Sequence, residues 1–288
     1  MARPSLAIAP NDRWISATVC HVMDIHVWSL LTHIDEFVFP IESQSTSLAR
    51  KGVQSTNRVF VVIERGKQNS PPFTAKPHIP GQNLTTHAKM NYIEYGISRI
   101  FANAKGRDAR LFTKGPAFTQ NPQSTLTLDC LEVGPSGSHM HIDLSAEGIG
   151  RFPTLSWKAA TPDVKEYLLV SEDPDAPLSS PIVHGIYYGI PASVTSVTDV
   201  DFEVADGEYK LQGGFKYGKN RRGTVYIPPR PLLGHGPHRY FFTLVALSQP
   251  VDATKLSSLP TIEEMATEIE GKVLSWGEWI GVYERKWE

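Results

Sequence analysis

The feature that most constrains the fold is a series of short apolar runs, separated by turns, from about residue 125 to the end of the chain. The turns are rich in glycine, proline and aspartate, which interrupt regular structure. Many short strands with turn signals between them predict a mainly β protein, built as a sandwich or a barrel. The runs expected to form strands are Thr125–Val133, Glu166–Val170, Ile182–Ile190, Val194–Val204, Tyr240–Leu247 and Trp279–Tyr283.

Two segments have helical periodicity instead. An amphipathic helix is expected to begin at Met90 and to end before Gly106. A late helix is expected after Thr261, which forms a capping-box pattern with Glu264. The apolar residues on one face of the first helix are Ile93, Ile97, Ile100, Phe101 and Ala104.

The first 89 residues differ in character from the rest. They contain one short strand-like run, Val59–Ile63, and a stretch rich in proline, asparagine and glycine over 68–83 that is typical of a linker. We therefore expect 1–89 to be a poorly structured N-terminal extension and 90–288 to be the folded domain. The change at Met90 suggests the hypothesis that translation starts there and that the extension is a gene-model artefact.

The composition of the chain argues against several classes of protein. The formal net charge of −2 gives no general attraction to nucleic acids or anionic membranes. Two cysteines, Cys20 and Cys130, are too few for a disulfide framework. No apolar run is long enough to span a bilayer, and Asn11–Arg13 interrupts any secretory signal. The sequence predicts a cytoplasmic protein that neither spans a membrane nor binds nucleic acid.

The first candidate segment for a functional site is the loop Asp173–Pro177. Its prolines restrict the backbone, so that Asp173 and Asp175 lose little freedom when they face a site. His184 follows on the next strand-like run. A carboxylate that accepts a hydrogen bond from one histidine nitrogen fixes the tautomer and orients the other nitrogen.

A second candidate is the segment Gly234–Tyr240, which brings His238 and Tyr240 to the start of an apolar run. Its glycines let backbone approach a ligand closely, and successive N–H groups in such a turn can bind an anion. Together the two segments suit a small, dry anion-binding pocket. Each residue taken singly has a structural alternative, such as an Asx turn for the aspartates or a buried core position for His184.

At these residues the chain resembles the phosphatidylethanolamine-binding protein family, which includes the Raf kinase inhibitor proteins. The two signatures of the family appear as Asp173–Pro177 and Gly236–Tyr240, and Phe152–Trp157 is similar to its Pro-x-x-Ser-Trp strand. The resemblance covers roughly residue 90 to the C-terminus. Since no long C-terminal helix follows Tyr283, the chain looks more like the bacterial and filamentous-fungal branches.

The resemblance implies a Greek-key β-sandwich with a few short peripheral helices, and a ligand pocket. Two departures predict a changed pocket mouth: Ile182 stands where the family often has tryptophan, and the family's Gly-x-Pro-Pro loop reads Pro228–Leu232. Carried over position by position, the ligand-binding residues are Asp173, Asp175, His184, Pro231, His238 and Tyr240.

The resemblance implies a protein that binds a small anion, either a phosphate or lipid head group or a carboxylate, with a further protein partner such as a kinase or protease. The alternative is an accessory enzyme of fungal secondary metabolism, as in the coupling of anhydride monomers into maleidrides. In that reading His184 or His238 transfers a proton and Asp173 orients it, in C–C coupling or cyclisation rather than hydrolysis.

No cofactor or metal is expected. The sequence has no phosphate-binding P-loop, no dinucleotide fingerprint and no nucleophile elbow. His139 and His141 lie on one face of a strand, but no third ligand is spaced near them. Asp173, His184 and His238 have metal-binding side chains, for which the resemblance implies an anion pocket instead.

Overall fold

The structure is a computed structural model that describes residues 86–287, apart from 160, 206 and 208. Contacts divide the chain into two units, Met1–His87 and Ala88–Glu288, and the second unit carries the features that follow. The expected linker over 68–83, the strand-like run Val59–Ile63 and Cys20 lie outside the described residues. The expected N-terminal extension stays a prediction.

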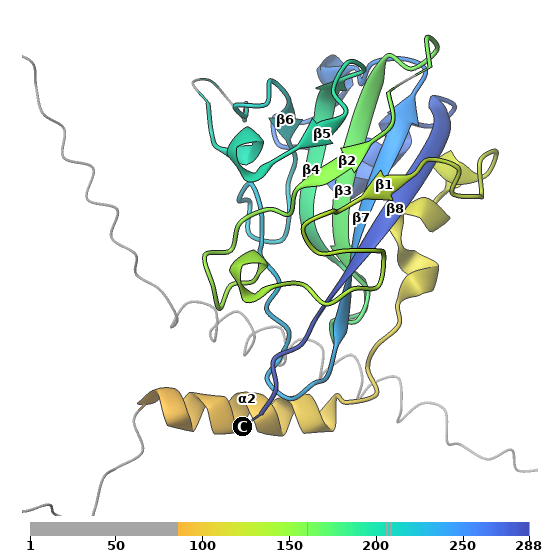
Figure 1. Ribbon diagram of the computed structural model, residues 1–288. Helices are drawn as coiled ribbons and strands as arrows, with labels where there is room; N and C mark the ends of the chain where they lie inside the picture. The colour runs from red at the N-terminus through yellow and green to blue at the C-terminus, as the bar shows by residue number, and fades with distance from the viewer. Residues whose placement is uncertain (1–85, 160, 206, 208, 288) are drawn as a thin grey trace, which may run out of the picture. The chain divides into compact units, whose positions relative to one another are not determined.

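The second unit is mainly β, as the short strands predicted, and consists of two antiparallel sheets (Figure 1). A five-stranded sheet has the order β6-β4-β3-β7-β8, and a three-stranded sheet, β1-β2-β5, lies over one of its faces. The strands are β1 (Leu128–Asp129), β2 (Leu155–Trp157), β3 (Glu166–Asp173), β4 (Ile182–Pro191), β5 (Ser196–Val197), β6 (Lys216–Tyr217), β7 (His238–Leu247) and β8 (Val273–Tyr283).

The α-helices are α2 (Thr86–Ile100) and α3 (Ile262–Glu268). The capping box before α3 is confirmed, since Thr261 and Glu264 each accept a hydrogen bond from the other's backbone N–H. Short 3₁₀ turns are η1 (Asp108–Arg110), η2 (Phe112–Lys114), η3 (Pro116–Phe118), η4 (Ile142–Leu144), η5 (Asp199–Phe202) and η6 (Ala253–Lys255).

The strand expected over Val194–Val204 is wrong for most of its length. Only β5 forms there, and η5 follows at once. The reason is local, because Thr198 and Asp201 form a capping box that fixes a helical turn in a segment with apolar periodicity.

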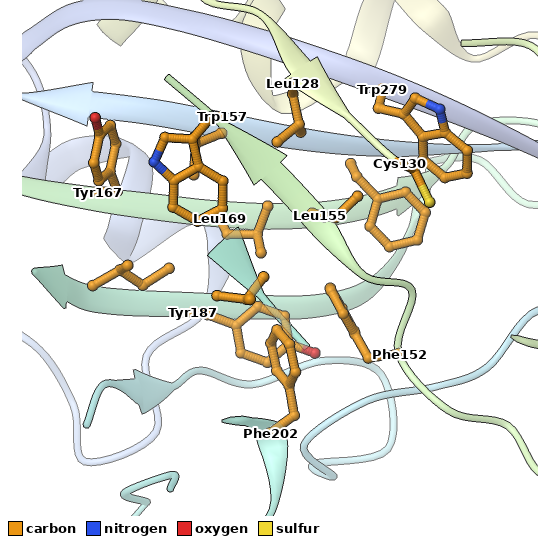
Figure 2. Close-up of a cluster of buried hydrophobic side chains, with 14 of the residues drawn as sticks. Leu128, Cys130, Phe152, Leu155, Trp157, Tyr167, Leu169, Tyr187, Phe202 and Trp279 are labelled. Carbon is orange, nitrogen blue, oxygen red and sulfur yellow. The ribbon is translucent and has the colours of Figure 1, made fainter. Parts of the chain in front are cut away.

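The core has two parts. One fills the space between the two sheets, and the other covers the outer face of the larger sheet. Tyr167 and Leu169 of β3 pack towards β2 and its Trp157 (Figure 2). Leu168 and Val170 point to the other face, where α3, η2 and η3 cover them. All eight residues of β3 are buried, so its end is held rigidly in the middle of the molecule. That end is where Asp173 lies.

Helix α2 begins at Thr86, before Met90, because nothing in Thr86–Lys89 breaks a helix. Its buried side chains are polar ones, Glu94 and Ser98, and not the apolar residues of the expected face. Ile93 and Ile100 are 48% and 71% exposed. The helix is held by ion pairs and stacking to the C-terminal end of the chain, which runs beside it (Figure 1).

Glu172 gives a testable pH dependence. It lies on the face of β3 opposite Asp173, where its carboxyl accepts a hydrogen bond from the backbone N–H of Phe112, and burial raises its pKa to about 7. The unfolded value is about 4.3, so the native state binds the proton more tightly, and stability falls as the pH rises from about 4.3 to 7. We expect Glu172→Gln to be about 3 kcal/mol more stable than the wild type at about pH 8, and equal to it near pH 4.

Urea unfolding at the two pH values measures this difference. Glu270→Gln, at an exposed position, is the matched control and is expected to change stability by less than about 0.5 kcal/mol at either pH. An equal effect of Glu172→Gln at both pH values would contradict the prediction.

Candidate functional site

Two neighbouring strands bring the two sequence signatures together. Strands β3 and β7 are antiparallel and pair Glu172 with Phe241, so the end of β3 adjoins the start of β7. Asp173 therefore lies beside His238 and Tyr240, although more than sixty residues separate them in the sequence. Pairing of the strands, and not the loop sequences alone, assembles the cluster.

His184 reaches the cluster through a β-bulge. Strand β4 pairs Gly185 with Ser171 and Val183 with Glu172, so His184 is an extra residue without an opposite partner. Bulges of this kind re-aim a side chain, and they are common next to functional sites. The His184 ring packs edge-on against Tyr240, with 5.1 Å between the ring centroids.

Asp173 is buried, and its carboxylate is fully occupied. One oxygen accepts hydrogen bonds from the backbone N–H groups of Asp175 (2.7 Å) and Ala176 (3.1 Å), which fold the loop back on the side chain. The other oxygen is 2.8 Å from Nδ1 of His238. The predicted orientation of a histidine by this carboxylate is present in the geometry.

His238 is joined to a second histidine that the sequence reasoning left out of the site. Its Nε2 is 2.7 Å from Nδ1 of His235, and Nε2 of His235 is 2.9 Å from the carbonyl oxygen of Phe101. Phe101 follows directly after α2, and its carbonyl also accepts a hydrogen bond from the backbone N–H of Ala104 at 2.7 Å. The result is a continuous chain from Asp173 through both rings to the end of α2.

The partners of each ring nitrogen limit where the hydrogens in this chain can lie. The Phe101 carbonyl only accepts, so His235 Nε2 carries a hydrogen, and His238 Nδ1 donates to the Asp173 carboxylate. A hydrogen must also lie between the two facing nitrogens, because two lone pairs would repel each other. Asp173 and His235 thus engage both nitrogens of His238, and burial lowers the pKa of His235, which favours its neutral ring. His238 has no nitrogen left to face a ligand.

His184, unlike His238, has one ring nitrogen without a partner among the described residues. Its Nδ1 is 2.6 Å from the carbonyl oxygen of Ile227 and must donate to it. Its Nε2 is buried and has no hydrogen-bond partner among the described residues. Burial lowers the pKa of His184 below the usual value, which favours the neutral ring. In the neutral ring the free nitrogen is an acceptor, whereas a protonated ring would present the donor expected from the sequence.

Two tyrosines, Tyr240 and Tyr226, lie on the core side of the site. The Tyr240 side chain is buried, and its ring is the one that packs against His184. The Tyr226 hydroxyl is buried without a partner among the described residues, and its ring stacks edge-on with Phe152. Burial raises the pKa of both phenols, which stay protonated as donors.

Asp175 has a different environment from Asp173. Its carboxylate oxygens accept from the Nε, NH2 and backbone N–H of Arg239 and from the backbone N–H of Gly106. Burial alone would raise its pKa, but the Arg239 hydrogen bonds outweigh this and lower it. Arg239 also forms a bidentate pair with Asp108. The structure thus uses Asp175 to hold its own loop against β7 and the segment after α2.

Pro231 lies in a loop that α2 holds in place. Its carbonyl oxygen accepts from Arg285 at 3.1 Å, and Arg285 forms a buried ion pair with Glu94 of α2. Glu94 also accepts from the backbone N–H of Leu233 at 3.0 Å. Arg285 has a second carboxylate partner in Glu147, at 2.8 Å.

The sequence reasoning missed three contributors: His235, Tyr226 and the pair of Glu94 with Arg285. Only His235 had a usable signal, since it lies three residues before His238 in the same glycine-rich loop. Tyr226 and the ion pair depend on contacts between distant segments, which no local pattern marks.

In the part of the chain that the structure describes, no group of three or more histidine, cysteine, aspartate or glutamate side chains is arranged to hold a metal ion. None of the described helices is long and apolar enough to cross a bilayer.

This chain is similar to known proteins over most of the residues that the structure describes. Residues 132–284 match the family model of the phosphatidylethanolamine-binding proteins. The chain is 46% identical over 204 residues to "Phomoidride biosynthesis cluster protein B" of a fungal species, covering 70% of this chain and 98% of that protein. The protein of the same name in Talaromyces stipitatus is 45% identical, over 68% of this chain and 82% of that protein.

More distant similarities extend to bacteria. A "UPF0098 protein" of Aquifex aeolicus is 33% identical, over 46% of this chain and 74% of its own length. The crystal structure of YbcL from Escherichia coli, described as a member of the mammalian PEBP family, is 27% identical with a TM-score of 0.47, over 55% of this chain and 98% of that one. The family model and the close fungal relatives show that this chain belongs to the phosphatidylethanolamine-binding protein family.

Proposed function

We propose that this protein binds a small anionic ligand, a carboxylate or a phosphate head group, in a site formed by Asp173, His184, His238 and Tyr240. The observation that carries the proposal is a buried Nε2 of His184 without a partner among the described residues, on a ring that packs against Tyr240 beside the hydrogen-bonded pair of Asp173 and His238. Buried polar atoms are seldom left unpaired, and a bound ligand supplies the missing partners.

We further propose that the ligand is an intermediate of a secondary-metabolite pathway. The support is the name of the two fungal relatives, which places them in phomoidride biosynthesis, together with their coverage of the described unit. Head-group binding by a regulatory protein with a kinase or protease partner remains the other reading of the same site, and no described surface identifies such a partner.

A catalytic role is the second candidate. In this reading the protein is an accessory enzyme, for example in maleidride-type coupling of anhydride monomers or in a cyclisation, with the site moving a proton and stabilising an oxyanion. The specific observation in its favour is that His184 has an unpaired Nε2 on a buried ring whose pKa is lowered by burial, so that the neutral ring could take up a proton.

Gene deletion in the source organism tests the proposed function. We expect the deletion strain to lose one metabolite and to accumulate its precursor, and we expect the wild-type gene to restore the profile. A metabolite profile that does not change on deletion would contradict a role in such a pathway.

We also make a proposal about the limits of the functional domain and about the location of the protein in the cell. We propose that 90–288 is the functional unit and that translation starts at Met90, since the ion pair and hydrogen bonds of α2 begin at Glu94. Mass spectrometry of the endogenous protein tests this, and abundant peptides from before residue 90 would contradict it. We also propose a cytoplasmic location, with which the free buried thiol of Cys130 is compatible.

A further inference from the structure

Helix α2 is amphipathic, but it turns its faces the opposite way from an ordinary surface helix. A surface helix normally buries its apolar side chains against the core and keeps its charged ones in water. In α2 the buried positions are the polar residues Glu94 and Ser98. Tyr92, Ile93 and Ile100 are exposed instead. Because a buried ion pair anchors Glu94 to the end of the chain, the apolar face of the helix is left open.

The exposed side chains of α2 lie along one stripe of the helix. Residues spaced three or four apart share a helical face, and the exposed positions have this spacing. The residues of this α2 stripe are Lys89, Tyr92, Ile93, Gly96, Arg99 and Ile100. Gly96 lies at the centre, where an added Cβ would meet no atom within 4 Å. The middle of the stripe is therefore open space among the described residues.

The α2 stripe is also cationic. Lys89 and Arg99 are exposed within it. The sequence of α2 contains one acidic residue, Glu94, which is buried in its ion pair on the opposite face. No carboxylate of the helix therefore compensates the two cations. The net charge of −2 belongs to the whole chain and does not describe this local surface, which suits an anionic partner.

Two observations favour a lipid surface as that partner. Helix α2 lies across the strands at the end of the sheets where β7 begins (Figure 1), and the Trp287 ring packs against Tyr92 with 5.0 Å between centroids. Tryptophan and tyrosine favour the boundary between lipid tails and water. A second copy of the stripe would instead bring Lys89 and Arg99 close to like charges, which repel.

We propose that the α2 stripe is a docking surface for an anionic membrane. The helix lies in the plane of the head groups, with Tyr92, Ile93 and Ile100 at the apolar boundary and the cations at lipid phosphates. Such helices bind through buried apolar area together with attraction to anionic lipids. The surface is separate from the ligand pocket. A chain that starts at Met90 keeps the charge balance, because its α-amino group replaces Lys89 as a cation.

Flotation of the full chain with lipid vesicles tests the docking. We expect binding to vesicles of equimolar phosphatidylcholine and phosphatidylserine, and none to vesicles of phosphatidylcholine alone. Added salt is expected to weaken the binding, since salt screens exposed charges. Failure to bind the phosphatidylserine vesicles, or equal binding to both kinds, would overturn the proposal.

Aspartate substitutions in the stripe test its apolar part. Ile93→Asp and Ile100→Asp are each expected to weaken vesicle binding about tenfold, because an apolar side chain is lost from the boundary. Both positions are exposed, so the variants are expected to fold. Ile149→Asp adds the same charge at an exposed position outside α2 and is the control that keeps wild-type binding. Wild-type binding by both stripe variants would overturn the proposal.

Substitution of Gly96 distinguishes a membrane from a helical protein partner. Gly96→Leu adds an apolar side chain in open space and is expected to strengthen vesicle binding about tenfold. Gly96→Gln, with a similar helix propensity, is the matched control and is expected to bind as the wild type does. Leucine would instead block a close helix contact across Gly96. A dimer in sedimentation that Gly96→Leu dissociates would therefore overturn the proposal.

A pocket variant keeps this result separate from the proposed function. His184→Asn changes the ligand site but retains a donor to the Ile227 carbonyl, and it is expected to bind vesicles as the wild type does. Loss of vesicle binding in His184→Asn, with wild-type binding in Ile93→Asp, would place the lipid contact in the pocket and would overturn the assignment to α2.

Discussion

Replacing His238 by alanine is expected to abolish the function of the protein and to lower its stability by about 3 kcal/mol. The substitution removes the ion-pair partner of Asp173, whose carboxylate stays buried, and it breaks the contact with His235. Breaking a buried pair from one side is costly because the remaining charge is left uncompensated. Complementation of a deletion strain is expected to give the metabolite profile of the deletion.

A second variant separates loss of folding from loss of function. His238→Asn retains a donor to Asp173 but lacks the second ring nitrogen that contacts His235, so we expect it to fold and still to fail in complementation. His139→Ala, at a histidine outside the site, is the control and is expected to rescue fully. Full rescue by both His238 variants would contradict a role for the cluster and would favour function through a surface partner.

Replacing Glu94 by alanine is expected to lower the free energy of unfolding by about 3 kcal/mol and to weaken ligand binding. Arg285 is then left buried with only Glu147 as a carboxylate partner, and the backbone N–H of Leu233 loses its acceptor. The loop that contains Pro231 loses its link to α2. Urea unfolding and maleate calorimetry on the same preparation measure the two effects.

A double-mutant cycle separates the contribution of the charges of Glu94 and Arg285 to stability from the contribution of their packing. Glu94→Leu combined with Arg285→Met is expected to recover much of the stability, because apolar replacement of both partners removes the uncompensated charge. Glu94→Gln keeps an acceptor for Leu233 and is expected to fall between Glu94→Ala and the wild type. If Glu94→Ala lowered stability by less than about 1 kcal/mol, the ion pair would not hold α2 to the domain.

The replacements of His238 and Glu94 both test how the segment around α2 supports the loop before β7. The family model begins at residue 132, yet Glu94 and the Phe101 carbonyl contact the loop that carries Pro231, His235 and His238. Helix α2 therefore supports the site from outside the residues that match the family model. The Phe101 carbonyl at its end accepts a hydrogen bond from His235.

The sequence by itself determined the class of fold and the two motifs of the site. Short apolar runs between turns predicted β3, β4, β7 and β8, because strand period and turn chemistry are local properties. The capping box of α3 was readable for the same reason. Local rules failed at Val194–Val204, where a side-chain cap competes with the strand.

Only the tertiary structure decided the chemistry of each site residue. Asp173 and Asp175 look alike in sequence, but one is paired with His238 and the other with Arg239. His184 and His238 were both expected to be donors to a ligand, but only His184 keeps a free nitrogen, since the Ile227 carbonyl engages its Nδ1 while Asp173 and His235 engage both nitrogens of His238. Hydrogen-bond roles depend on which distant atoms surround a side chain, and strand pairing, not local sequence, brings those atoms together.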